Sequence, residues 1–211
     1  MVDQSRHPDS GSQTRMNLIL NVARLGVNIG LGLFYTSYLV KGLGIVAYGI
    51  LPLALILNQY VNVLAGSLTT SLTRFYAVAI HEHKRAEASR YLSSAIVAIA
   101  ALLVLLLPLL AGVVLRIDWL FNIPASHIDD ARILFSLMIL SFMMSLFSSL
   151  FGTTLYAANR LDLMNVVNIV RIVSRVSCTV LFFEGFSRSI VFVGYANVAA
   201  EVIVLLTSIS L

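Results

Sequence analysis

Residues 91–115 read YLSSAIVAIAALLVLLLPLLAGVVL, and this run contains no charged side chain. It exceeds the about 20 apolar residues that a helix needs to cross a bilayer, so it predicts a transmembrane helix. The rest of the chain has the same character, since 59% of its 211 residues are hydrophobic and only 11% are charged. The mean hydropathy is +0.92. The fold class that follows is all-α, a polytopic membrane protein.

Five further apolar runs accompany this one, with polar segments between them. The sequence therefore predicts a six-helix transmembrane lobe over 17–211, with spans at about 17–40, 45–73, 91–115, 133–158, 165–183 and 189–211. The KGLG at 41–44 predicts a tight turn between the first two spans. Residues 1–16 are polar and lack an apolar region followed by a cleavage site, so they predict a tail rather than a signal peptide.

Basic residues are divided unevenly between the two sides of the membrane. Seven lie in the tail and in the loops after the second and fourth spans, namely Arg6, Arg15, Arg74, Lys84, Arg85, Arg90 and Arg160. Four lie on the opposite side, namely Lys41, Arg116, Arg132 and Arg188. The positive-inside rule places the tail and the amino terminus in the cytoplasm. We expect a multi-pass protein of the cell (cytoplasmic or inner) membrane.

Four charged residues fall inside the predicted spans: Arg24, Arg171, Arg175 and Glu201. An arginine that faces lipid at the bilayer centre costs about 2.5–3.5 kcal/mol on insertion scales, so each charge needs a partner or water. Arginines near helix ends can instead extend to the headgroups, as Arg171 could. Arg175 is different, because only residues 176–183 separate it from Glu184, which places it within any span of normal length.

Polar residues follow these charges at helical spacing, on one face each of the first, second and fifth spans. The stripes are Asn17, Asn21, Arg24 and Asn28; Asn58, Asn62, Gly66, Thr69 and Thr73; and Asn168, Arg171, Arg175 and Thr179. Asparagines alone are better explained as glue between helices. Three arginines against one glutamate are not self-neutralising, so we expect a polar cavity for an anion. Its substrate-binding candidates are Arg24, Asn28, Arg171 and Arg175, with Asn21, Asn58, Asn62 and Asn168 in its lining.

Glu201 and Arg171 lie at similar depths, about 18–20 Å from the outer ends of their spans. An ion pair between them is expected, which would leave Arg24 and Arg175 for the ligand. The alternative is that Glu201 titrates during transport, as intramembrane carboxylates do in coupled transporters. The sequence leaves both roles open. Arginine donates two parallel hydrogen bonds and stays charged, so a diphosphate is the natural candidate ligand.

Other sites are disfavoured by spacing. The histidines of HEH at 81–83 are two residues apart in a polar segment, whereas metal-binding helices place them four apart. Asp129 and Asp130 lie where a helix is expected to start, so they favour its dipole rather than a metal. The single Cys178 cannot form a disulfide within the chain. Without a phosphate loop or nucleophile elbow, we expect no enzyme, no metal, no cofactor and no nucleic acid as partner.

Four segments carry a family resemblance: LVKGLGIVAYGILPL (39–53), TRFYAVAI (73–80), LFNIP (120–124) and YAANRLDLMNVVNIVRIV (156–173). In order and spacing across almost the whole chain, they resemble the polysaccharide biosynthesis flippases, which include the O-antigen and teichuronic-acid type transporters. The same superfamily holds multidrug exporters and the peptidoglycan-precursor flippase.

The resemblance implies alternating-access translocation of a polyprenyl-diphosphate-linked oligosaccharide, for lipopolysaccharide or exopolysaccharide, from the cytoplasmic to the outer leaflet. Family members are about twice this length and have two six-helix lobes, a repeat architecture common in transporters. This chain then corresponds to the amino-terminal lobe, and we expect a fragment rather than a dimerising half-transporter. The implied partners are the lipid-linked oligosaccharide, membrane lipids, the missing carboxyl-terminal lobe and glycan polymerase machinery. Two alternatives stay open: a multidrug or cation exporter of the same superfamily, and a membrane scaffold that transports nothing.

Overall fold

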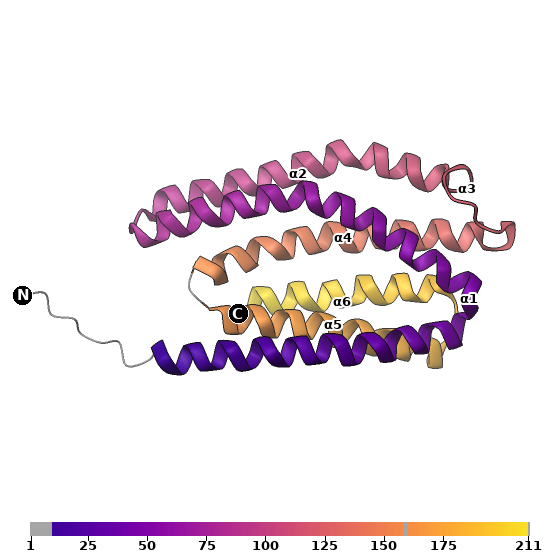
Figure 1. Cartoon of the computed structure of the whole chain (residues 1–211). Coiled ribbons are helices and arrows are strands. Elements are labelled where there is room, and N and C mark those ends of the chain that lie inside the picture. Colours follow the sequence, from indigo (N-terminus) through magenta and orange to yellow (C-terminus); the bar gives the residue numbers. More distant parts are fainter. Residues whose placement is uncertain (1–9, 158–159, 211) are drawn as a thin grey trace, which may run out of the picture.

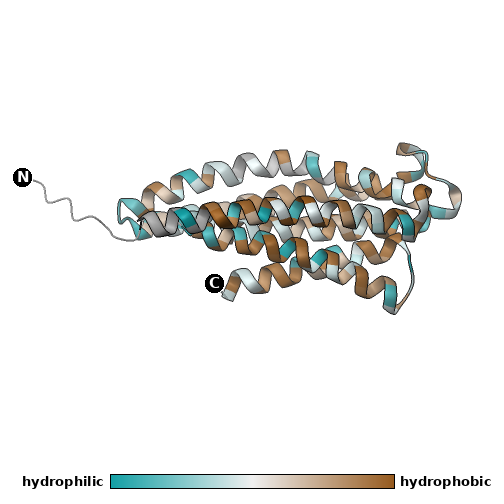
Figure 2. Ribbon diagram, turned by 60° about the horizontal axis from the view of Figure 1, so that its bottom comes forward, coloured by the Kyte–Doolittle hydropathy of each residue, from teal (hydrophilic) through white to brown (hydrophobic). Residues whose placement is uncertain are grey.

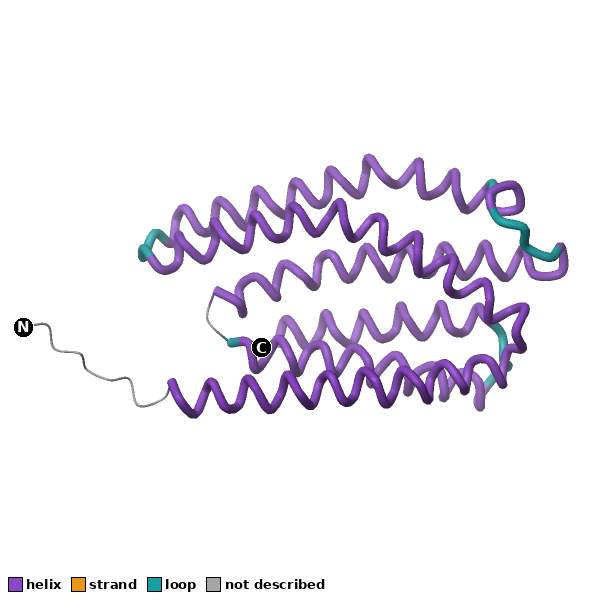
Figure 3. Tube along the Cα trace, viewed as in Figure 1, coloured by secondary structure: helices purple, strands orange, loops and turns teal. Residues whose placement is uncertain are grey.

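The computed structural model describes residues 10–157 and 160–210. The elements in these ranges are all helical (Figure 3). They are α1 (Ser10–His81), α2 (Arg85–Leu115), α3 (Ile117–Leu120), the 3-10 turn η1 (Ala125–His127), α4 (Ile128–Ala157), α5 (Leu161–Gly185) and α6 (Ile190–Ser210). The predicted fold class, a polytopic helical membrane protein, is confirmed. Five stretches of the described residues are long and apolar enough to cross a membrane: Leu18–Ile56, Arg85–Leu115, Ala125–Tyr156, Leu161–Gly185 and Ile190–Ser210.

The structure has five candidate membrane-spanning stretches, whereas the sequence predicts six spans, and the difference arises in helix α1. It is assigned as one element of 72 residues, but Gly44 inside it has φ 78° and ψ 162°, and the chain reverses direction there (Figure 1). We call residues 10–43 the first arm and residues 45–81 the second arm. Positive φ is accessible to glycine without steric cost. A single glycine, rather than the whole KGLG segment, thus makes the turn, and the two arms cover the positions of the first two predicted spans.

The helices form two groups, which meet along α4 and α6. In Figure 1 the second arm lies with α2 and α4, whereas the first arm lies with α5 and α6. The most extensive packing joins α4 to α6. At that contact a Cβ on Gly194 would lie 2.9 Å from Cδ1 of Leu137 and 3.0 Å from its Cβ. The missing side chain of Gly194 therefore permits the close approach of the two groups.

The two ends of the bundle differ in their packing. One end, which we call the packed end, contains the reversal of α1, α3 and the connection from α5 to α6 (Figure 1). A cluster of buried apolar residues joins both arms of α1 to α4, α5 and α6 there, and Leu134 and Phe135 within it are completely buried. A second cluster, from Leu72 through Leu150, joins only the second arm, α2 and α4. Apolar contact between the two groups is thus concentrated at the packed end, and we call the opposite end the open end.

Many residues along the helices are hydrophobic (Figure 2), and a large number of bulky apolar side chains are exposed. Examples are Val104 and Leu105 of α2, which are 70% and 72% exposed. Such surfaces suit contact with lipid chains. Helix α2 begins at Arg85, ahead of the span predicted from residue 91, so part of the polar segment 81–90 is its first turns rather than a loop. Asp129 and Asp130 lie in the first turn of α4, as expected.

Candidate functional site

A polar pocket of about 500 Å³ lies in the open end, between the two helix groups. The second arm, α4, α5 and α6 all contribute to its walls. Most of its polar residues carry hydroxyl groups: Thr69, Thr73, Ser145, Ser148, Ser149, Thr153, Tyr156 and Ser208. Asn168, Arg171 and Glu201 complete the polar lining. We call this cavity the open-end pocket.

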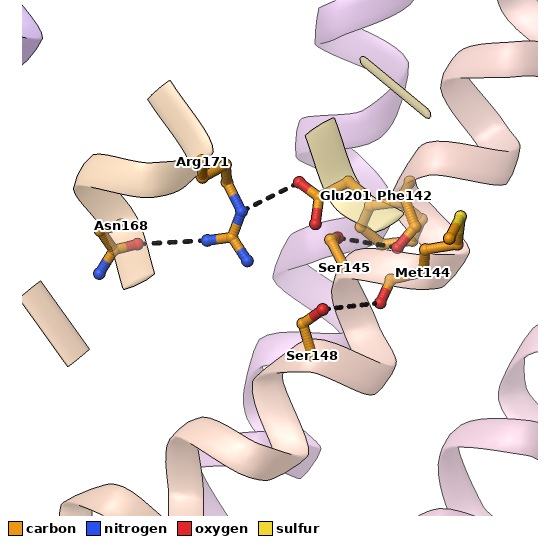
Figure 4. Close-up of polar contacts among 7 residues, drawn as sticks. All are labelled: Phe142, Met144, Ser145, Ser148, Asn168, Arg171 and Glu201. Carbon is orange, nitrogen blue, oxygen red and sulfur yellow. Dashed lines mark hydrogen bonds and ion pairs between the residues drawn. The ribbon is translucent and has the colours of Figure 1, made fainter. Parts of the chain in front are cut away.

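One wall of the open-end pocket is a hydroxyl face of α4. Ser148, Ser149 and Thr153 lie three, four and eight residues after Ser145, which places the four residues on one side of the helix. The hydroxyl of Ser145 donates to the carbonyl of Phe142 at 2.8 Å, and that of Ser148 donates to the carbonyl of Met144 at 3.2 Å (Figure 4). Because these bonds occupy only the hydroxyl hydrogen, the oxygens keep lone pairs for a ligand. No prediction from the sequence includes this wall, although the spacing within SFMMSLFSSLFGTT (141–154) is its signal.

The ion pair expected between α5 and α6 is present in the open-end pocket. Arg171 Nε lies 2.9 Å from Glu201 Oε1, with the side chains 31% and 10% exposed. Asn168, one turn earlier on α5, accepts a 3.2 Å hydrogen bond from Arg171 Nη1 and donates to the carbonyl of Met164 (Figure 4). Asn168 therefore lines the pocket as predicted, and it also holds the guanidinium group of Arg171 in place.

The pair lies deep in the membrane-spanning part of both helices. Arg171 is about 15 Å along the axis from the start of α5, and Glu201 is about 14 Å from the end of α6. At such depth an isolated charge is costly, so each side chain offsets the charge of the other. The pairing is incomplete, because Glu201 Oε2 accepts no hydrogen bond from the described residues. Arg171 Nε lies close to Glu201, but its N–H makes no hydrogen bond with any acceptor of the described residues.

Arg175 does not line the open-end pocket, which corrects the expectation of one shared cavity. Its guanidinium carbon lies 5.7 Å from the ring centroid of Tyr35 on the first arm. It lines a separate cavity of about 200 Å³, the Arg175 pocket, together with Tyr35, Tyr48 and Asn197. The hydroxyl groups of Tyr35 and Thr179 are hydrogen-bonded at 3.0 Å. A turn of α5 is enough to separate the two arginines, because the first arm lines the Arg175 pocket but supplies none of the residues that line the open-end pocket.

Arg24, predicted in the cavity, is exposed on the first arm. Its Nη1 donates a 3.3 Å hydrogen bond to Asn165 Oδ1, and it lines neither of the two pockets. Most described positions of the first arm from residue 18 to 37 are exposed, because other helices cover little of this part of the arm. Asn21 and Asn28 are exposed on the same arm.

The second predicted stripe is divided in the same way. Thr69 and Thr73 line the open-end pocket, and the Thr73 hydroxyl lies 3.2 Å from that of Thr153 on α4. The side chains of Asn58 and Asn62, predicted to line the cavity, lie outside the described part of the chain. Of the predicted residues, the structure thus brings Asn168, Arg171 and Glu201 together and separates Arg24 and Arg175 from them.

Comparisons with known proteins agree with the membrane character of the chain. It is 29% identical over 188 residues to the uncharacterized membrane protein EpsK of Bacillus subtilis (strain 168). Taken with the five apolar helices, this similarity decides the class. The chain is a multi-pass membrane protein. The match covers 89% of this chain but 37% of EpsK, so the chain spans little more than a third of its relative. No protein-family model and no solved structure matches the chain.

Proposed function

We propose that this chain forms one lobe of a transporter that moves a polyprenyl-diphosphate-linked oligosaccharide across the cytoplasmic membrane by alternating access. The observation that carries the proposal is the open-end pocket, where an arginine at mid-membrane depth lies in a cavity lined by many hydroxyl groups. The opposite end of the same bundle is filled by buried apolar side chains. A polar site accessible from one side and closed on the other is what alternating access requires of each of its states.

The chemistry of the pocket suits a phosphorylated sugar carrier. Arg171 can bind diphosphate oxygens with parallel hydrogen bonds, and the hydroxyls of α4 and the second arm can bind phosphate or sugar. A volume of about 500 Å³ is within the range of small-molecule sites. It accommodates a diphosphate and an adjoining sugar rather than a whole oligosaccharide. The remaining glycan would then contact parts of the transporter outside this lobe, and the greater length of the relative supports this reading.

The side of the membrane follows from charge. The start of α1, the connection from α1 to α2 and the start of α5 lie at the open end (Figure 1). Five basic residues lie in or beside these segments, namely Arg15, Lys84, Arg85, Arg90 and Arg160, against four at the packed end, namely Lys41, Arg116, Arg132 and Arg188. By the positive-inside rule the open end faces the cytoplasm. The structure then corresponds to a state that receives substrate from the inner leaflet. The missing lobe, the membrane lipids and a glycan polymerase are the partners of this proposed function.

The two alternatives fit the pocket less well. A drug or cation exporter needs an intramembrane carboxylate free to face a cation, yet Arg171 Nε lies 2.9 Å from Glu201. That arginine cancels the negative charge of the site. A scaffold without transport needs helix packing alone, for which a pocket with a charged pair at its centre is an expensive addition.

Replacement of Arg171 tests the proposal in the native host. We expect Arg171→Gln to lower glycan export at least about tenfold, because diphosphate loses its charged partner. Arg171→Lys keeps the charge beside Glu201 but not the planar fork, so it should give an intermediate loss. Export is measured as surface glycan, and as transfer of a fluorescent polyprenyl-diphosphate oligosaccharide in proteoliposomes.

The matched control is Arg160→Gln, which removes an exposed arginine paired with Asp162 outside the pocket. It should export normally. Equal membrane levels of all variants exclude a loss of insertion. Normal glycan display from Arg171→Gln, and also from Arg24→Ala and Arg175→Ala, would favour the scaffold.

A further inference from the structure

Helices α5 and α6 present two matching levels, one helical turn apart. At the first level Arg171 of α5 faces Glu201 of α6. One turn along, Arg175 of α5 and Asn197 of α6 line the Arg175 pocket together. The helices are antiparallel, so four residues forward on α5 correspond to four residues backward on α6. Glu201 therefore lies about one turn, or about 5.4 Å, from the level of a second arginine.

Glu201 and Arg175, at the two levels, each have a polar atom without a hydrogen-bond partner among the described residues. Glu201 is 7% exposed, and its Oε2 accepts no hydrogen bond within the described ranges. Arg175 Nε likewise has no hydrogen-bond partner among the described residues. A buried carboxylate bound by one oxygen, beside a second arginine with an unpaired donor, has an alternative arrangement within reach.

We propose that Glu201 is a switchable counter-ion: it pairs with Arg171 when the open-end pocket is empty and moves to Arg175 when a phosphate-bearing anion takes Arg171. The proposal deepens the proposed function and rests on it, because it assumes that the anion binds at Arg171. Glu201 is then a built-in competitor for the substrate's place, and Arg175 is a positioning residue that receives the displaced carboxylate.

Electrostatics gives the switch its direction. A diphosphate at Arg171 would place like charges beside the Glu201 carboxylate in a poorly screened site, which expels the carboxylate. The next cation along α5 is Arg175, one helical turn after Arg171 and outside the open-end pocket. Without that second arginine, Glu201 would have to stay next to the anion or lose its charge. The ligand's affinity therefore depends on Arg175, although Arg175 does not line the ligand's pocket.

The switch also links the two ends of the bundle. Arg175 now lies against the ring of Tyr35 on the first arm, and Tyr35 is packed against the apolar cluster of the packed end. If Arg175 turns toward Glu201, it leaves that ring. Binding at the open end thereby weakens a contact at the border of the packed end, in the direction that alternating access needs.

A double-mutant cycle tests the switch with the full chain in lipid nanodiscs and geranylgeranyl diphosphate as the probe. Glu201→Gln should bind the probe about tenfold more tightly than the wild type, because the competing charge is gone. Arg175→Gln should bind it about tenfold more weakly, because displaced Glu201 has no second partner. In the Glu201→Gln background, Arg175→Gln should change the affinity by less than about twofold.

Each outcome of the cycle decides between two proposals. If binding requires Arg171 but neither Glu201→Gln nor Arg175→Gln shifts the affinity, the switch is wrong and the proposed function stands. A tenfold loss from Arg175→Gln that persists with Glu201→Gln also overturns the switch, since Arg175 would then bind the probe itself. Equal affinity of Arg171→Gln and the wild type, or no binding by any variant, overturns the site and the proposed function together.

One variant keeps the test decisive if another does not fold. Loss of Glu201 leaves a cation deep in the bundle, which can destabilise it. Arg175→Gln breaks no ion pair among the described residues, so the affinity of this variant alone is informative: an unchanged value overturns the switch. Arg160→Gln serves as the control for nonspecific loss of positive charge and should bind as the wild type does.

Discussion

Helix α4 has two different halves, and the difference shows how the bundle is built. Near its start, Leu134 and Phe135 are fully buried in the cluster of the packed end. Further along the same helix, Ser145, Ser148 and Ser149 line the open-end pocket. One half is fixed by apolar contact between the two helix groups, whereas the other faces a polar space between them. The packed end therefore fixes the two groups by apolar contact, whereas at the open end polar side chains line the space between them.

The same contrast applies to α6, where Gly194 and Glu201 lie two turns apart. Gly194 is in close contact with Leu137, and Glu201 is held by a single charged partner. Steric contact fixes a distance between helices, but an ion pair in a polar pocket can exchange partners. We therefore expect substitutions at the packed end to change stability, and substitutions at the open end to change ligand binding.

The largest difference should come from two substitutions on α4. Phe135→Ala removes a fully buried ring that packs against Phe121, with ring centroids 5.7 Å apart. We expect a loss of about 3–5 kcal/mol, the usual cost of such a cavity. Ser148→Ala removes a pocket hydroxyl whose hydrogen is bonded within its own helix, and it should cost less than about 1 kcal/mol. Unfolding of both variants is measured in detergent, with the reaction of Cys178 with a thiol dye as the readout.

Cys178 makes that measurement simple, because it is the single cysteine of the sequence and is partly buried on α5. Comparable losses from both substitutions would contradict the contrast between the two ends. Ser148→Ala should instead weaken binding of the diphosphate probe. Phe135→Ala should weaken that binding only to the extent that it unfolds the protein.

A smaller loss is expected where α4 meets α6. Gly194→Leu inserts a side chain where even a Cβ would lie 2.9 Å from Leu137, so the helices must separate. Overpacking of this kind costs about 1–3 kcal/mol. The matched control is Gly112→Leu on α2, since a Cβ there meets nothing within 4 Å. Comparison of the thermal unfolding of the two variants separates the effect of crowding at Gly194 from the general effect of replacing glycine by leucine in a helix. If the control loses as much as Gly194→Leu, the contact does not fix the spacing of α4 and α6.

Much of the fold, but less of the site, could be predicted from the sequence. Long apolar runs indicate membrane helices whatever their neighbours, and equal depth along two helices was enough to pair Arg171 with Glu201. The direction of a helix face was not accessible, because it depends on which helix packs there. Arg24 and Arg175 lie on predicted polar faces, yet one is exposed and the other enters its own pocket.

Residues of intermediate polarity were the other source of error. The serines of α4 add little to hydropathy and carry no charge, so an apolar run conceals them. The role of Gly194 could not be predicted from the sequence either, because it depends on Leu137 of another helix. In both cases the signal is a spacing or a neighbour rather than a residue type.

The smallest effect tests the border between the two ends. Tyr35→Phe removes the hydroxyl that lies 3.0 Å from Thr179, but it keeps the ring that Arg175 contacts. We expect a loss of about 0.5–1.5 kcal/mol, the usual net worth of one hydrogen bond. The loss should stay small because the Thr179 hydroxyl still donates to the carbonyl of Arg175 at 2.8 Å. Tyr60→Phe, at a residue 71% exposed, is the control and should unfold as the wild type does. A loss above about 3 kcal/mol would mean that this hydroxyl, rather than the apolar cluster, holds the first arm to α5. The packed end would then begin at Tyr35, and a switch of Arg175 away from its ring would disturb far more than one contact.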